Sequence, residues 1–227
     1  MGALRYPATA LLSRTPGTLS GPKKHDRAIV GSMRKGEATR STILDEAFRL
    51  ATRVGFEGVT IGQLAEQTEL SKSGLYAHFA SKEQLQLDTL ARAREHFIDR
   101  VVRPALATER GEPRVRMLFE RWVAWAEEGD GCLFVAASAE LDDRPGRLRD
   151  ALVRNEVDWL DLIATVARTA ISEGHFREDL DPDQFAYELH GIELAHHHAV
   201  RLLRDPRAGA RTRTAFESLV VAARGTH

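Results

Sequence analysis

The sequence is poor in cysteine and in long apolar runs. Cys132 is the only cysteine among 227 residues, which excludes an internal disulfide and a zinc site built from several thiolates. No apolar run approaches the roughly 20 residues needed to span a bilayer. The apolar stretch 8–12 is too short for the core of a signal peptide. We therefore expect a cytoplasmic protein with no membrane partner.

A large excess of charge is also missing, since the formal net charge is −1, but the charges are unevenly placed. Residues 1–33 carry 5 basic and 1 acidic side chains, residues 34–82 carry 7 and 6, and residues 83–227 carry 20 and 26. A neutral to basic front and an acidic rear fit a chain whose first part meets DNA and whose remainder DNA repels. Such asymmetry is common, so it indicates little by itself.

Strand-like alternation is absent, and apolar positions recur at helical spacing from residue 37 onward. The sequence therefore predicts an all-α fold of about nine helices. One of them should run from 82 to about 102 and end at Pro104, which cannot continue a helix. Residues 1–32 hold several prolines and glycines and show no apolar period. We expect residues 1–36 to be a disordered N-terminal extension.

The most informative segment holds three hydroxyl residues at N-cap positions, namely Thr60, Ser71 and Ser81. An N-cap oxygen accepts a backbone N–H from the first turn of the helix that follows it. Apolar pairs flank these caps in the manner of a hydrophobic staple. The pattern predicts two short helices, 61–67 and 72–78, joined by a tight turn. This is the signature of a helix-turn-helix.

A helix-turn-helix reads DNA by laying its second helix in the major groove. On helix 72–78, Lys72 and Ser73 have the reach and chemistry for base edges. Gly74 allows close approach of the backbone beside the capping Ser71. Residues at helix ends or on the same exposed face are expected to contact phosphates: Thr60, Tyr76, His78 and Lys82. A basic arm before the first helix could follow the DNA backbone or minor groove: Arg34, Lys35 and Arg40.

Residues 60–65, 70–79 and 81–85 closely resemble the N-terminal domain of the tetracycline-repressor (TetR) family. The match covers about residues 38–86, and its core is the run Leu-Tyr-x-His-Phe-x-x-Lys-Glu-x-Leu. The resemblance implies a helical homodimer, usually a repressor that a small ligand releases from its operator. By position it implies base contacts from Lys72 and Ser73. It also implies phosphate contacts from four residues: Thr60, Tyr76, His78 and Lys82. The front extension is not part of the family pattern.

The resemblance implies a helix-turn-helix DNA-binding domain over residues 37–82 and a helical ligand-binding and dimerisation domain over 83–227. The last two helices would form the four-helix bundle of the dimer. Their apolar stripes are equally needed for a monomer core: Phe185, Leu189 and Ile192, then Phe216, Leu219 and Val220. Four aromatic residues suggest an apolar cavity for a small-molecule effector, although rings at this spacing can also simply fill a core: Trp122, Trp125, Phe134 and Trp159.

His190, Glu193 and His197 share one helical face, a spacing that can present two imidazoles and a carboxylate to a metal. No second cluster accompanies them, so we favour packing or pocket lining and predict no metal and no cofactor. Cys132 is interpreted as a buried hydrophobe rather than a redox sensor. The chain has neither a nucleophile elbow nor a glycine-rich phosphate loop, so no enzymatic activity is expected.

The sequence thus predicts a DNA-binding regulator that a small, largely apolar ligand releases from a palindromic operator. One alternative is a DNA-binding regulator controlled by a metal or a protein partner. Another is a helical interaction module that has lost DNA binding, which the intact polar surface of residues 72–82 disfavours.

Overall fold

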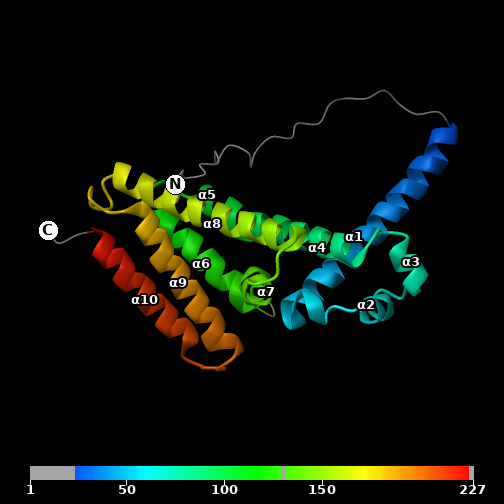
Figure 1. Ribbon diagram of the computed structural model, residues 1–227. Coiled ribbons are helices and arrows are strands. Elements are labelled where there is room, and N and C mark those ends of the chain that lie inside the picture. The colour runs from blue at the N-terminus through cyan, green and yellow to red at the C-terminus, as the bar shows by residue number, and fades with distance from the viewer. Residues whose placement is uncertain (1–23, 129–130, 225–227) are drawn as a thin grey trace.

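The computed structural model describes residues 24–128 and 131–224, and every regular element in these ranges is a helix (Figure 1). The expected all-α fold is confirmed. No helix in the two ranges is long and apolar enough to cross a membrane. The elements are α1 (Lys24–Gly58), α2 (Ile61–Gln67), α3 (Lys72–Tyr76), α4 (Lys82–Phe97), the π-helical turn η2 (Ile98–Val102), α5 (Arg103–Leu106), α6 (Glu112–Glu128), α7 (Leu133–Leu141), α8 (Arg147–Ser172), α9 (Pro182–Arg201) and α10 (Ala208–Arg224).

Helices α1, α2 and α3 form a small head at one end of the molecule (Figure 1). The three predicted N-caps form: the hydroxyls of Thr60, Ser71 and Ser81 each accept a backbone N–H three residues ahead, at 3.0–3.2 Å. Each such cap stabilises its helix by about 1 kcal/mol. Three large apolar side chains of this segment are buried: Leu64, Leu75 and Phe79.

Helix α1 begins at Lys24, so residues 24–36 are helical where the sequence predicted part of a disordered extension. The last proline of the front segment is Pro22, and a helix can begin directly after a proline. The first turns of α1 project away from the rest of the molecule (Figure 1). Residues 1–23 of the predicted extension lie outside the described residues, and the division into three domains stays a prediction.

The helix that begins at Lys82 does not end at Pro104, as the sequence predicted, but continues to Leu106. It passes the proline through η2, where the N–H of Arg103 donates to the carbonyl of Ile98, five residues back. Proline has no N–H, and in a regular α-helix its ring crowds the carbonyl four residues before it. A wider π turn relieves that crowding. The helix therefore changes locally to hydrogen bonds between residues five apart and continues instead of ending.

Helix α4 is shared between the head and the body, which comprises the remaining helices. Its first turn buries Leu85, and its last turn buries Phe97. It packs against α1 at the head end and against α8 in the body. One continuous apolar cluster therefore runs from Ile43 in α1 to Val220 in α10. Burial of each large apolar side chain contributes about 1.5–3 kcal/mol.

Helices α9 and α10 lie side by side along the body (Figure 1). The apolar stripes read from the sequence point into the monomer, since Phe185, Leu189, Phe216 and Val220 are all buried. The two helices also carry apolar side chains on a different, exposed face: Tyr187, Leu194 and Val221. The stripes thus supply the core of the monomer, and any partner surface on these helices lies elsewhere on them.

A carboxylate of the body holds the kinked end of α1. Gly55 breaks the helix at φ 75°, a left-handed conformation that favours glycine. Glu140, near the end of α7, accepts the N–H of Phe56 at 2.8 Å and the N–H of Glu57 at 2.6 Å. A Cβ at Gly55 would lie 2.5 Å from Glu140 Oε2, so the kink needs glycine for space as well. Hydrogen bonds to a charged acceptor are roughly twice as strong as neutral ones.

We expect Glu140→Gln to lower the free energy of unfolding by about 1–2 kcal/mol, because an amide has a single acceptor oxygen and its NH2 group would face one of the two N–H donors. The melting temperature should fall by roughly 2–4 °C for each kcal/mol lost. Asp143→Asn, an exposed carboxylate just beyond α7, is the matched control and should melt like the parent. Equal melting temperatures for the two variants would contradict the role given to Glu140.

Candidate DNA interface and ligand cavity

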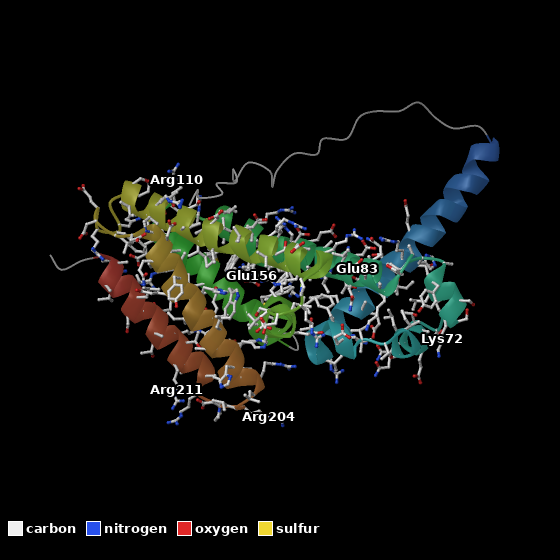
Figure 2. The ribbon with its side chains drawn as sticks, viewed as in Figure 1. Lys72, Glu83, Arg110, Glu156, Arg204 and Arg211 are labelled. Carbon is white, nitrogen blue, oxygen red and sulfur yellow. The ribbon has the colours of Figure 1, made fainter. Side chains whose placement is uncertain are left out.

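The outer face of the head carries the side chains predicted to read DNA. Lys72 and Ser73 are exposed at the start of α3, and Tyr76 at its end is 53% exposed. Lys72 lies at the periphery of the head, far from the cavity-bearing part of the body (Figure 2). An ammonium group, a hydroxyl and a phenol on one surface suit contacts to phosphates and to base edges.

The turn that leads into α3 is held by local hydrogen bonds. Ser71 Oγ accepts the N–H of Gly74 and lies 3.0 Å from the hydroxyl of Ser73. A Cβ at Gly74 would lie 3.2 Å from Ser71 Oγ, which is tighter than ordinary contact. Thr60 is exposed at the start of α2, and His78 is half-buried just after α3. These positions agree with surface roles, and the DNA contacts themselves stay predictions.

Two predicted DNA-contacting cations already have partners within the protein. Lys82 lies 3.6 Å from Glu57, a surface pair worth less than about 1 kcal/mol. Arg40 donates to Asp88 at 2.5 Å and lies over the ring of Phe79 at 5.0 Å. A phosphate can readily take Lys82 from its weak pair. Arg40 instead joins α1 to α4, a structural role that the sequence analysis did not anticipate.

A cavity lies in the body among α4, η2, α6, α7, α8 and α9. Its volume of about 60 Å³ would hold roughly four to six water molecules, at about 10–15 Å³ each. Three of the four aromatic residues predicted to bind ligand line it: Trp122, Phe134 and Trp159.

Trp125 does not line the cavity, contrary to the prediction. It stacks on Phe48 at 5.9 Å and meets Phe97 edge-on at 5.6 Å. The position lies about 4.5 Å further along α6 than Trp122, at a rise of about 1.5 Å per residue. That offset places Trp125 against the head helix α1, where it packs the junction between head and body.

Three titratable groups meet at one wall of the cavity. Glu193 is 1% exposed, and its Oε2 accepts the indole N–H of Trp159 at 2.9 Å. His190 Nδ1 lies 3.2 Å from the same oxygen, and its Nε2 lies 3.8 Å from Glu156 Oε2. On the neighbouring wall, Arg94 donates to Asn155 at 3.0 Å and to Asp158 at 2.7 Å, and these three residues also line the cavity.

The surroundings shift the proton affinities of these groups. Burial raises the pKa of Glu193, against the opposing hydrogen bonds from His190 and Trp159. Burial also raises the pKa of Glu156, against the charge of His190. For His190 burial acts to lower the pKa, but the hydrogen bond and charge of Glu193 together with Glu156 raise it overall. The two carboxylates thus favour a cation between them.

The structure does not assemble the alternative metal site. Among the described residues no group of three or more suitable side chains is placed to hold a metal ion. His197 lies beside Gly131 and Arg201, whereas His190 and Glu193 face the cavity. The physical reason is that His190 and His197 are two turns apart on α9, about 10.5 Å along the axis.

The sequence favours packing or pocket lining for His190 and Glu193 over a metal site, and it does not single out Glu156, Arg94 or Asn155. The spacing of Glu156 and Trp159 on one face of α8 was a usable signal. Nothing in the sequence indicates that this face meets His190 and Glu193 of α9, because that requires the packing of two helices.

Two family models match the chain. The one described as bacterial regulatory proteins of the tetR family covers residues 43–88. The one described as a tetracyclin repressor-like C-terminal domain covers residues 111–216, which hold most of the cavity-lining residues.

Two curated relatives are similar over about the same length. The HTH-type transcriptional regulator TcmR of Streptomyces glaucescens is 30% identical over 151 residues, covering 63% of this chain and 63% of TcmR. The HTH-type transcriptional repressor DhaR of Mycobacterium sp. is 27% identical over 151 residues, covering 65% and 74% respectively. The match therefore spans less than two thirds of TcmR.

Solved structures share the fold. A TetR transcriptional regulator from Chloroflexus aurantiacus superposes with a TM-score of 0.75 at 26% identity, over 83% of this chain and 95% of that one. AibR, solved in complex with isovaleryl coenzyme A and operator DNA, gives a TM-score of 0.64 at 20% identity, over 83% and 100%.

Cys132 is predicted to be unreactive in the folded protein. Burial raises its pKa to about 11, and the thiolate is the reactive form. At pH 8 an aromatic disulfide reagent should label the native thiol about 100-fold more slowly than the thiol of the guanidinium-unfolded chain. The raised pKa stabilises the fold below about pH 8.5, where an unfolded thiol is protonated, and this contribution is lost as the pH rises toward 11. Rapid stoichiometric labelling of the native protein at pH 8 would show that the thiol is accessible and would contradict this prediction.

Proposed function

The chain belongs to the tetracycline-repressor family, and from that premise we propose that it is a transcriptional repressor. It binds a palindromic operator as a homodimer and leaves it when a small molecule occupies the body cavity. Its role is regulatory rather than catalytic, and it acts in the cytoplasm with the DNA. The observation that carries the proposal is the exposed face of Lys72, Ser73 and Tyr76 on α3, the second of two capped helices.

Helix α3 supports the DNA-binding part of this proposal. Lys72 and Ser73 reach base edges, while Thr60, Tyr76, His78 and Lys82 hold phosphates on either side. In a two-fold dimer, two such helices meet successive major grooves about 34–36 Å apart, which makes the operator palindromic. The name of DhaR as a repressor supports repression as the outcome.

The exposed faces of α9 and α10 support dimerisation. Tyr187 and Leu194 lie two turns apart on one face of α9 and are 73% and 40% exposed, and Val221 on α10 is 59% exposed. At Gly191, between the two α9 residues, an added Cβ would meet nothing within 4 Å. Large apolar side chains gathered on a surface mark an interface. A second copy of the same helix pair would cover this face as a four-helix bundle.

Two helices connect the cavity to the head. Phe97 and Ile98 line the cavity at one end of α4, and Lys82 faces DNA at its other end. Helix α7 begins at the cavity with Phe134 and holds α1 through Glu140 near its other end. A ligand larger than the present cavity must move one of these walls. A hundredfold loss of operator affinity needs a coupling free energy of about 2.7 kcal/mol, an ordinary value.

DNA binding is tested by two lysine variants. Lys82→Ala should weaken binding to every duplex and reduce the salt dependence by about one ion per protomer, because it removes a phosphate contact. Lys72→Ala should change the preferred sequence, at about 1–3 kcal/mol for each lost base contact. Both effects are measured by selection from random duplexes and by titration at several salt concentrations.

Arg110→Ala is the control for these variants, because Arg110 is an exposed cation at the far end of the body (Figure 2). It should leave operator affinity unchanged. A selection that enriched no palindrome with the parent protein would contradict the proposed function.

Dimerisation is tested at the exposed face of α9. Leu194→Glu should convert the dimer to a monomer, because it places a charge in the centre of a desolvated surface. Val153→Glu on α8 is the matched control, since Val153 is 42% exposed, and it should stay dimeric. Sedimentation velocity distinguishes the two states, and a dimeric Leu194→Glu variant would place the interface elsewhere.

A further inference from the structure

The body cavity contains a buried carboxylate with one unused oxygen. Glu193 Oε2 accepts the indole of Trp159 and faces His190, as described above. Glu193 Oε1 is buried and has no hydrogen-bond partner within the part of the chain that the structure describes. Buried polar atoms are nearly always paired, and an unpaired carboxylate oxygen is costly. The oxygen belongs to a cavity-lining residue, so a ligand in the cavity can supply either a hydrogen-bond donor or a positive charge.

The charges that line the cavity do not balance. The lining holds three carboxylates and one guanidinium, together with the single imidazole of His190. The guanidinium group of Arg94 already donates hydrogen bonds to Asp158 and Asn155. His190 lies between Glu193 and Glu156, and even when protonated it compensates only one of them. When all three carboxyl groups are ionised, one negative charge among the described residues that line the site therefore remains without a counter-ion.

Aromatic rings form much of the remaining wall, together with aliphatic side chains such as Ile98 and Leu162. Phe97 meets Trp159 edge-on at 5.0 Å and Phe134 edge-on at 5.6 Å, and Trp122 completes the set. Aromatic rings attract organic cations through their negative faces, most strongly in a desolvated site. Rings and carboxylates together select an ammonium group over a hydrated inorganic ion, which would need a shell of oxygen ligands instead.

We propose that the effector is an organic monocation whose ammonium head group lies beside Glu193 and Glu156, against the aromatic wall. The inference rests on the proposed function, because it names the ligand class of the same cavity. The volume of about 60 Å³ suits such a head group, and any apolar tail must open the site further. An anion would meet Glu193 and Glu156 and compete with Asp158 for Arg94. An uncharged apolar ligand would offer Glu193 Oε1 neither a hydrogen-bond donor nor a positive charge.

The test compares three probes of similar size with the full chain: phenyltrimethylammonium, its uncharged isostere tert-butylbenzene, and the anion benzoate. Tryptophan fluorescence reports binding directly, because Trp122 and Trp159 line the cavity. The cation should bind at least tenfold more tightly than either other probe. Equal or tighter binding of tert-butylbenzene or benzoate would overturn the proposal.

Glu193→Gln keeps the shape of the side chain and an acceptor for Trp159 but removes the charge. It should lose at least tenfold in affinity for the cation and little for tert-butylbenzene. Glu188→Gln, an exposed carboxylate on the same helix, is the matched control and should bind like the parent. Glu156→Gln provides a second variant if Glu193→Gln does not fold, and its cation affinity should fall in the same way. Cation affinity that neither substitution lowers would overturn the proposal.

Operator release, measured with the same probes, separates the two proposals. Tight cation binding without release of DNA would support the ligand class and contradict the switch. Release by uncharged or anionic probes alone would support the switch and contradict the ligand class.

Discussion

Burial of one face of α4, from Leu85 in the head to Phe97 in the body, joins the two parts of this protein into one apolar cluster. Because the same helix begins at Lys82 on the outer surface and ends at the cavity wall, its position cannot change at one end alone. Densely packed interiors transmit displacement rather than absorb it. The π turn that follows keeps this helix continuous past Pro104 and places Ile98 and Val102 on the cavity.

Hydrogen bonds also join the head to the body. Glu140 accepts hydrogen bonds from the N–H groups of Phe56 and Glu57, just after the kink at Gly55, and these bonds fix the orientation of the end of α1 relative to α7. Apolar contact alone tolerates sliding, whereas two short hydrogen bonds to one carboxylate do not. The head is therefore oriented by α7, a helix that itself begins at the cavity.

The cavity combines features that a purely structural core avoids. A carboxylate in the interior is costly unless it is paired, and Glu193 keeps one oxygen unpaired. Sites of this kind sacrifice stability for binding, and local conflicts between polarity and burial gather at functional positions. Trp125, which was expected in the same cavity, instead packs the junction with Phe48, and its buried indole N–H also has no acceptor among the described residues.

The sequence by itself determined the local structure: the caps at Thr60, Ser71 and Ser81, the buried positions of α2 and α3, and the all-helical class. These follow from spacings of three and four residues, which any helix makes adjacent. Tertiary structure alone decided that His190 of α9 meets Glu156 of α8, and that Arg40 pairs with Asp88. Those pairs join residues far apart in the chain, and their meeting depends on how whole helices pack, which no local pattern encodes.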